Sequence, residues 1–264
     1  IYSSNHPAGF NANVVPTASS KSVLLSFVAM AQALVVITAG IDLSVGMIFT
    51  LTNCLASWIV VGSPVQVFFG VVGVLLVGAL CGAINGAIVI YGRLQPIVTT
   101  IATGAVYYGI ALAIRPNPGG SVDETLADFF TGRFFGFIPA SLMTLAAVVL
   151  VVWVPFSRSV TGRAAYAVGS SEAAPYMSRV NIRRAKFAAY TLSGLLAGIG
   201  GLFLTFFTYT GEAAYASGNA YTLFSIAAVV LGGVSLFGGK GSAIGAIFGA
   251  MAFRTIGDLL FAFD

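Results

Sequence analysis

Charged residues are scarce in this sequence: they make up 8% of its 264 positions, whereas apolar residues make up 58%. A soluble domain carries about 25% charged residues, so this chain has too few charges to cover a surface that faces water. The mean hydropathy is +0.97. The apolar residues fall into segments of about twenty, the length that a helix needs to cross about 30 Å of hydrocarbon. These features predict an integral membrane protein.

Residues that carry catalysis or bind metals are equally scarce, with two cysteines and one histidine. Cys54 and Cys81 lie inside apolar segments and are interpreted as small buried side chains with no disulfide framework. His6 lies in a polar N-terminal tail, and one histidine cannot form a metal site alone. No pair of acids within the apolar segments could share general acid–base work. We therefore predict neither an enzyme nor a metal site.

The net charge of +4 does not predict nucleic-acid binding. The basic residues stand in short gaps between apolar segments and form no stripe or arm, so lipid is the expected surrounding. The sequence opens IYSSNHPAGF, without an initiator Met and without a cleavable signal peptide. We therefore expect it to be part of a longer chain.

Hydropathy predicts eight membrane segments in a single transmembrane domain over residues 1–264. In lipid every backbone polar group must be satisfied internally, so the segments are predicted to be helices of an all-α bundle. Stretches such as VVGVLLVGAL lack the alternation that barrel strands need. The predicted segments are 22–41, 43–61, 65–91, 96–114, 137–156, 187–210, 219–238 and 241–263.

The linker 157–186 sets the predicted orientation, because it holds six basic residues and a single acid, Glu172. Cytoplasmic loops carry an excess of Lys and Arg, so this linker is predicted to be cytoplasmic. Alternation of the segments then puts eight basic residues on that face and three on the other. The linker is also long and polar beside loops of a few residues, as a docking element for a soluble motor would be.

The joint between the first two segments is very short and contains an acid, Asp42, within GIDLSVG at 40–46. A carboxylate at membrane depth is costly and usually has a partner or faces water. Two interpretations stay open. Asp42 or Ser44 could cap the following helix at a tight turn, or Asp42 could line or gate a polar path.

Polar side chains on the third and fourth segments raise a similar question. An amide or hydroxyl inside the bilayer either bonds across helices or faces a water-filled path, and both roles stay open here. The residues concerned are Asn85, Gln95, Thr99, Thr100 and Thr103.

Glycines recur at four-residue spacing in three segments. Such ridges let helix backbones approach closely, and close packing holds helices together in lipid. We therefore predict helix-packing ridges at Gly78, Gly82 and Gly86, at Gly194 and Gly198, and at Gly241, Gly245 and Gly249.

The glycine-rich stretch 232–242 does not match a phosphate-binding P-loop. That motif needs a glycine and a Ser or Thr where this chain has Val234 and Gly241. The glycines more simply turn the chain between two helices, with Lys240 at the surface. We therefore expect the chain to bind neither ATP nor another cofactor itself.

Four separated blocks stand out in the sequence: GIDLSVG (40–46), GAINGAIVIYGRLQPIVTT (82–100), AVGSSEAAPYMSRVNIRRAKFAAYTLSGLLAGIGG (167–201) and IAAVVLGGVSLFGGKGSAIGAIFGA (226–250). In this order they resemble the membrane subunits of ribose-type ABC importers, which are related to the branched-chain amino-acid permeases. The resemblance covers residues 22–260 and implies that the eight segments are the core of a ten-helix permease in the bacterial inner membrane. Two features depart from the family pattern: Arg179 stands where the family usually has glycine, and Pro175 follows residues 172–174.

The resemblance implies a dimer of permeases, identical or not, with two cytoplasmic ATPase subunits that bind ATP and Mg and a periplasmic solute-binding protein. It also suggests two sets of site residues. The substrate-path candidates are Asp42, Asn53, Asn85, Gln95, Thr99 and Thr103. The ATPase-coupling candidates are Ser171, Glu172, Ala173, Ala174, Met177, Ser178, Arg179 and Asn181.

The expected function is ATP-driven import of a monosaccharide or similar small polar solute. Two other classes stay open. A self-sufficient channel or secondary carrier would move solute without ATP, and a non-transporting membrane assembly factor or enzyme would show no solute-dependent behaviour. Only the importer requires an ATPase bound to the linker 157–186.

Overall fold

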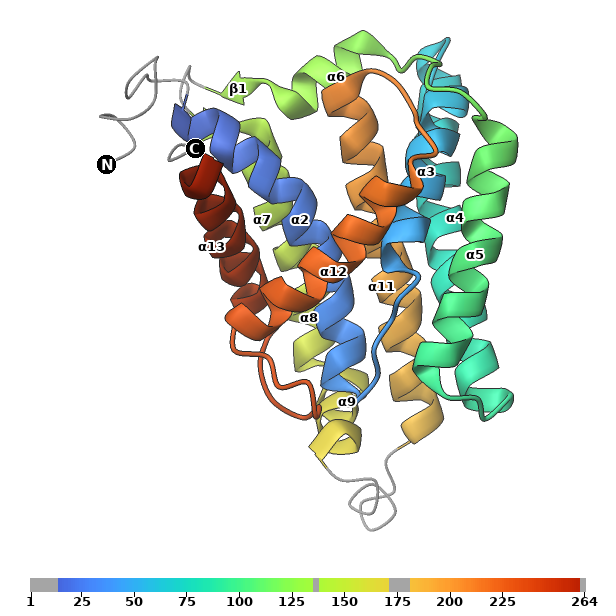
Figure 1. The fold of residues 1–264 in the computed structure, drawn as a ribbon, viewed down its shortest axis with the longest axis vertical. Coiled ribbons are helices and arrows are strands. Elements are labelled where there is room, and N and C mark those ends of the chain that lie inside the picture. Colours follow the sequence, from blue (N-terminus) through green and yellow to red (C-terminus); the bar gives the residue numbers. More distant parts are fainter. Residues whose placement is uncertain (1–13, 135–137, 171–180, 262–264) are drawn as a thin grey trace.

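The computed structural model describes residues 14–134, 138–170 and 181–261, and it confirms the predicted all-α membrane fold (Figure 1). A short antiparallel pair, β1 (Arg133–Phe134) with β2 (Ile138–Pro139), interrupts the helices. The helices are α2 (Val14–Ile37), α3 (Val45–Ile59), α4 (Pro64–Tyr91), α5 (Pro96–Ile114), α6 (Glu124–Thr131), α7 (Ala140–Val148), the π-helical η1 (Val149–Trp153), α8 (Val154–Arg158), α9 (Val160–Ser170), α11 (Ile182–Thr208), α12 (Tyr215–Leu231) and α13 (Ala243–Phe261).

Four helical stretches in the described part of the chain are long and apolar enough to cross a membrane: α4, α5, α11 and the continuous run 140–158 through α7, η1 and α8. Their bounds lie within five residues of the predicted segments. In the run 140–158, Pro155 has no N–H to donate to the preceding turn, which accounts for the local widening into the π-helix. The count of eight crossings, and the ten-helix permease, stay predictions.

The joint between the first two predicted segments differs from the expected tight turn. Helix α2 ends at Ile37, and residues 38–44 then run back into the bundle before α3 begins near its mid-height (Figure 1). The 15 residues of α3 span about 22 Å at the usual rise, which is short of about 30 Å of hydrocarbon. We call residues 38–44 the first break.

A second short helix follows α11 in the same way. Residues 209–214, which we call the second break, turn back along the bundle, and α12 begins below the upper end of α11 and descends (Figure 1). Tyr209 starts this break with φ of 57°, which ends α11. The expected seventh segment, 219–238, is therefore shifted: α12 begins at Tyr215 and ends at Leu231.

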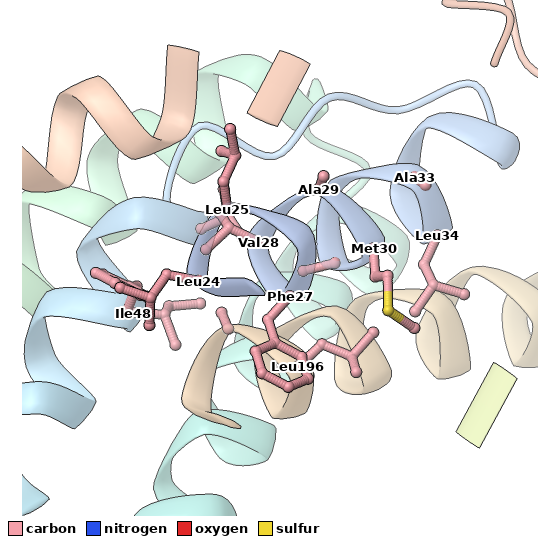
Figure 2. Close-up of a cluster of buried hydrophobic side chains, with 14 of the residues drawn as sticks. Leu24, Leu25, Phe27, Val28, Ala29, Met30, Ala33, Leu34, Ile48 and Leu196 are labelled. Atoms are coloured by element: carbon pink, nitrogen blue, oxygen red, sulfur yellow. The ribbon is translucent and has the colours of Figure 1, made fainter. Parts of the chain in front are cut away.

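Helix α2 forms the centre of the bundle, because every side chain from residue 22 to 37 is buried. A helix that is apolar all round is stable only when it is surrounded by other helices. Figure 2 shows Leu24 beside Ile48 of α3, and Phe27 beside Leu196 of α11. Helices α11 and α13 pack along α2, and α4 packs along the far side of α11 (Figure 1).

The predicted glycines of α4 and α11 lie at a close contact between these two helices. A methyl group on Gly82 would overlap the carbonyl oxygen of Tyr190, and one on Gly194 would overlap that of Gly78. A methyl group on Gly198 would lie 3.3 Å from the Cα of Gly78, and one on Gly86 would lie 3.1 Å from the Cβ of Tyr190. Backbone is thus packed directly on backbone between α4 and α11.

The remaining ridge residues pack α13 against the end of α12. A methyl group on Gly249 would overlap the carbonyl oxygen of Ala228, and one on Gly245 would overlap that of Gly232. Gly241 lies before the helix, with φ of 110°, and turns the chain against Val234.

Candidate functional site

The first break is held by a buried chain of hydrogen bonds. Asp42 is fully buried, and its Oδ1 accepts from the backbone N–H of Ser44 at 2.8 Å and from the Ser44 hydroxyl at 2.6 Å. The Ser44 hydroxyl in turn accepts from Nδ2 of Asn85 at 2.7 Å. Tyr107 donates to Oδ1 of Asn85 at 3.0 Å, with the carbonyl oxygen of Cys81 equally close. Helices α4 and α5 therefore fix the start of α3.

A further bond fastens the same break to α5. The backbone N–H of Leu43 donates to Oγ1 of Thr100 at 2.9 Å. Non-helical backbone at membrane depth is stable only where its polar groups find partners in protein or water. Asp42 Oδ2, by contrast, has no hydrogen-bond partner among the described residues and is buried.

Asn53 holds the second break in a comparable way. Its Nδ2 donates to Oγ1 of Thr205 at 2.9 Å and to the carbonyl oxygen of Thr210 at 3.3 Å. Its Oδ1 accepts from the backbone N–H of Glu212 at 2.9 Å. One buried amide on α3 thereby fixes the chain that enters α12.

Residues of the second break also form hydrogen bonds with the loop before α6 and with α6 itself. Gly211 and Gly119 exchange two backbone hydrogen bonds, of 2.8 and 3.0 Å. The hydroxyl of Tyr209 donates to the carboxylate of Asp128 on α6, and this bond raises the pKa of Tyr209 above its ordinary value. Arg115 donates from Nη2 to the carbonyl oxygen of Ser57 at 2.7 Å.

The two short helices cross each other at paired glycines and threonines. The backbone N–H of Gly46 on α3 donates to Oγ1 of Thr222 on α12 at 3.1 Å. A methyl group on Gly218 would lie 2.6 Å from Oγ1 of Thr50, and one on Gly46 would overlap the carbonyl oxygen of Gly218. We call this contact the short-helix crossing.

The two sides of the short-helix crossing share a sequence pattern. Gly46-Met47-Ile48-Phe49-Thr50-Leu51 and Gly218-Asn219-Ala220-Tyr221-Thr222-Leu223 both read Gly-x-x-aromatic-Thr-Leu. The aromatic members contact each other, with the ring centroids of Phe49 and Tyr221 at 4.5 Å. Each threonine also donates to its own glycine carbonyl, at 3.0 Å on α3 and 3.2 Å on α12. Since α3 ascends and α12 descends (Figure 1), the crossing has the form of an inverted repeat.

The structure brings only some of the predicted path residues together. Asp42 and Asn85 share one cluster, whereas Asn53 lies in the other. Gln95 lies apart at the start of α5, where its side chain is exposed and makes no capping bond. The two threonines among the path candidates, Thr99 and Thr103, lie on α5. Thr99 is buried, and Thr103 donates to its carbonyl oxygen at 3.1 Å within the helix.

Sequence reasoning missed Tyr107 and both partners of Gly46, namely Gly218 and Thr222. The repeated Gly-x-x-aromatic-Thr-Leu pattern could have identified the last two. No local pattern marks Tyr107, because its partners lie on another helix.

The coupling candidates Ser171, Glu172, Ala173, Ala174, Met177, Ser178 and Arg179 lie outside the described residues. Asn181 is described: its side chain accepts from the backbone N–H of Arg184 at 3.0 Å and caps α11. Just before the linker's undescribed part, Tyr166 of α9 donates to the carbonyl oxygen of Gly241 at 2.7 Å. Gly239 of the same turn donates to the carbonyl oxygen of Ile37 at 2.9 Å. The end of α9 and the 232–242 turn thus meet at the lower end of α2.

A cavity of about 750 Å³ lies between α4, α6, α7 and α11. Its walls are mainly apolar and include Phe68, Phe203 and Phe206. A polar solute would lose its hydration there and gain few hydrogen bonds. This cavity is therefore a poor site for a polar solute.

The comparisons with known proteins agree with a transport role. A family model described as "Branched-chain amino acid transport system / permease component" matches residues 17–263. The chain belongs to this permease family. It is thus a transport component, and family permeases do not carry the ATPase site.

Individual relatives align over most of the chain. The ribose import permease protein RbsC of Haemophilus influenzae is 32% identical over 269 residues, covering 100% of this chain and 82% of the relative. The ribose import permease of Escherichia coli K12 is 34% identical, covering 95% and 78%. The fructose import permease FrcC of Rhizobium meliloti is 33% identical, covering 92% and 69%. No solved structure matches the chain.

Proposed function

We propose that this chain is the membrane-spanning permease subunit of an ATP-driven importer for a monosaccharide or a similar small polar solute. The observation that carries the proposal is the match of nearly the whole chain to the permease family and to ribose and fructose import permeases. The two broken helices agree with it, because transporters commonly bind solute where membrane helices are interrupted.

The assembly we propose contains two permeases, identical or not, and two ATPase subunits on the cytoplasmic side. ATP and Mg are bound by the ATPase subunits, and this chain binds no cofactor. A periplasmic binding protein delivers the solute. In this proposal the chain lies in a bacterial inner membrane, residues 1–264 form one domain, and eight segments form the core of a ten-helix permease.

The linker 157–186 is proposed to face the cytoplasm and to contact the ATPase. Its basic residues support this orientation, because Lys and Arg collect on the cytoplasmic side of membrane proteins. The coupling candidates 171–179 fall within it, and Asn181 fixes the start of the helix that follows. A displacement of the linker would therefore be transmitted directly to α11, which packs on α2, α3 and α4.

A sugar suits this chain better than a charged solute. The side chains of the two clusters at the breaks are mainly amides and hydroxyls. Asp42 is the acid in the first cluster, and Glu212 joins the second through its backbone N–H. The family description, by contrast, names branched-chain amino acids. An amino-acid importer is therefore the second candidate, and it predicts a binding protein that takes leucine and no pentose.

Reconstitution tests the function. The chain is co-expressed with a candidate ATPase and a candidate binding protein from the same organism, and uptake of radiolabelled D-ribose, D-fructose and L-leucine is measured in proteoliposomes with and without ATP. We expect ATP-dependent uptake of a sugar only with the binding protein present. Uptake by the chain alone without ATP would establish the self-sufficient carrier instead. ATP-dependent uptake of leucine alone would establish the amino-acid importer.

A further inference from the structure

The side of the short-helix crossing that faces α5 carries polar groups that have no hydrogen-bond partner among the described residues. Asn219 of α12 is exposed, and Tyr215 is 55% exposed one turn before it. Neither side chain makes a hydrogen bond within the described part of the chain, and the same holds for the hydroxyl of Tyr108 on α5. Residues four apart lie on one face of a helix, so Tyr215 and Asn219 point in a similar direction.

Tyr108 of α5 and Tyr215 of α12 contact each other, so they connect the two helices that border this surface. Their ring centroids are 5.0 Å apart with planes at 71°, an edge-to-face contact. The first turn of α3 lies between α5 and α12. A methyl group on Gly104 of α5 would lie 3.4 Å from Ser44. One on Gly218 of α12 would lie 3.2 Å from the sulfur of Met47. The tyrosine pair therefore stands above the start of α3.

A lipid-facing position does not fit these residues. An amide in hydrocarbon without a partner is costly, and polar residues in membrane helices generally face the bundle interior or a water-filled cavity. Asn219 lies in the second turn of a helix that begins within the bundle (Figure 1). By contrast, the exposed residues in the middle of α4 are apolar, such as Leu76 and Leu80. The surface is thus suited to water and solute.

We propose that Tyr108, Tyr215 and Asn219 form a contact site for a polyhydroxylated solute along the transport path. The aromatic rings offer apolar faces to the C–H groups of a sugar ring. The two phenol hydroxyls and the amide can donate to and accept from its hydroxyl groups. No charge is present among the three, which matches an uncharged solute. This inference rests on the proposed import function and assigns residues to it.

The three side chains also lie beside a contact that a conformational change would alter. Tyr215 begins α12, and the short-helix crossing lies one to two turns further along at Gly218 and Thr222. Tyr108 is fixed to α5. A shift of α12 relative to α3 would therefore separate the tyrosine rings and release a solute held by both.

The test uses the complete transporter in proteoliposomes, with the binding protein loaded with the sugar that the wild type imports. Tyr215→Ala, Tyr108→Ala and Asn219→Ala are compared with Tyr91→Ala, which removes an exposed tyrosine at the end of α4. We expect the three site variants to import about two- to tenfold less solute per ATP hydrolysed, as the loss of one or two weak contacts predicts. Tyr215→Phe keeps the ring and should lose less than Tyr215→Ala. Abundance and ATPase activity should stay normal.

The outcomes separate this site from the function itself. Wild-type import with unchanged solute-to-ATP ratios in all three variants would overturn the site and leave the importer intact. A loss of the permease dimer or of binding-protein docking in the variants, with the ratio unchanged, would identify the surface as a protein interface and also overturn the site. A wild type that imports no sugar would refute the proposed function before any variant is compared.

Discussion

The backbone N–H of Gly46 and the hydroxyl oxygen of Thr222 are joined by a hydrogen bond of 3.1 Å across 176 residues of sequence. This bond connects the first turn of α3 to the second turn of α12. Because each short helix follows a break, the bond links the two places where the bundle departs from simple membrane-spanning helices. A movement of one short helix would therefore displace the other.

Thr222→Val should weaken this link. Valine keeps the shape but leaves the buried N–H of Gly46 without its acceptor, at a cost of about 1–3 kcal/mol. Thr255→Val is the control, since the Thr255 hydroxyl is exposed and bonds only within its own helix, to Met251. Thermal unfolding of the purified protein in detergent measures the difference. Equal midpoints for the two variants would show that the Gly46–Thr222 bond contributes nothing measurable.

Gly82→Leu should prevent normal assembly of the bundle. The backbone of α11 at Tyr190 and Gly194 leaves no room for a side chain at this position, so α4 and α11 would be forced apart. Gly257→Leu is the matched control, because nothing lies within 4 Å of a side chain placed there. Yield and monodispersity in detergent are the readouts. If Gly82→Leu matched Gly257→Leu in both, close backbone packing between these helices would be disproved.

Asp42→Asn distinguishes the two interpretations left open for this acid. The structure favours a fastening role, because Oδ1 accepts two hydrogen bonds from Ser44 and an amide oxygen can accept both. We therefore expect Asp42→Asn to retain abundance and most uptake, whereas Asp42→Leu should lose both. Uptake abolished by Asp42→Asn at normal abundance would instead show that the charge itself acts in the transport path.

The helices could be predicted from sequence, and the breaks could not. Hydropathy identified α4, α5 and α11 closely, because lipid allows few structures other than helices. Residues 38–44 fell almost wholly within the predicted segments 22–41 and 43–61, and residues 211–214 fell in the predicted connection between 187–210 and 219–238. No local pattern showed that either stretch runs back along the bundle. Thr100 and Asn53 accept hydrogen bonds from the backbone of the breaks, and Asn85 donates to the Ser44 hydroxyl; all three are distant in sequence from the break they hold. A local sequence pattern does not indicate partners that lie far away in the sequence.

The candidate site shows the same limit. Asp42, Asn53 and Asn85 could be singled out because polar residues are rare in this chain, but their partners could not. Gln95 has the same chemistry and is exposed at a helix end, since residue type alone does not give depth or orientation. The Gly-x-x-aromatic-Thr-Leu pattern is visible in the sequence, but only the structure shows that its two copies contact each other where α3 crosses α12.

Thiol labelling tests the orientation. Ser170 is exposed at the end of α9, and Ser121 is exposed in the loop before α6. Since Cys54 and Cys81 are buried, the native background should be low. With an impermeant maleimide, Ser121→Cys should react in intact spheroplasts and Ser170→Cys only after lysis. The reverse pattern would place the linker 157–186 outside the cell.

The linker's role in coupling is tested by Glu172→Lys and Ala173→Asp. Both positions lie outside the described residues. The linker's described parts bear on it: α9 contacts the 232–242 turn through Tyr166, and Asn181 caps α11. A protein docked between these two anchors would act on α2 and α11 together.

The two interpretations of the linker predict different results for these variants. If it is only a solvated loop, both substitutions should be nearly silent, because exposed changes usually fall within about 0.5 kcal/mol. If it docks the ATPase, each introduces charge or bulk into a packed contact and should reduce ATPase association several-fold. Membrane abundance should be normal either way, since the transmembrane helices are unchanged. We expect reduced recovery of the ATPase with the tagged permease and a matching loss of ATP-dependent uptake. Thr255→Ala, at an exposed position on α13 outside the linker, is the control and should retain both. Normal ATPase recovery and normal uptake in both variants would refute docking at this linker.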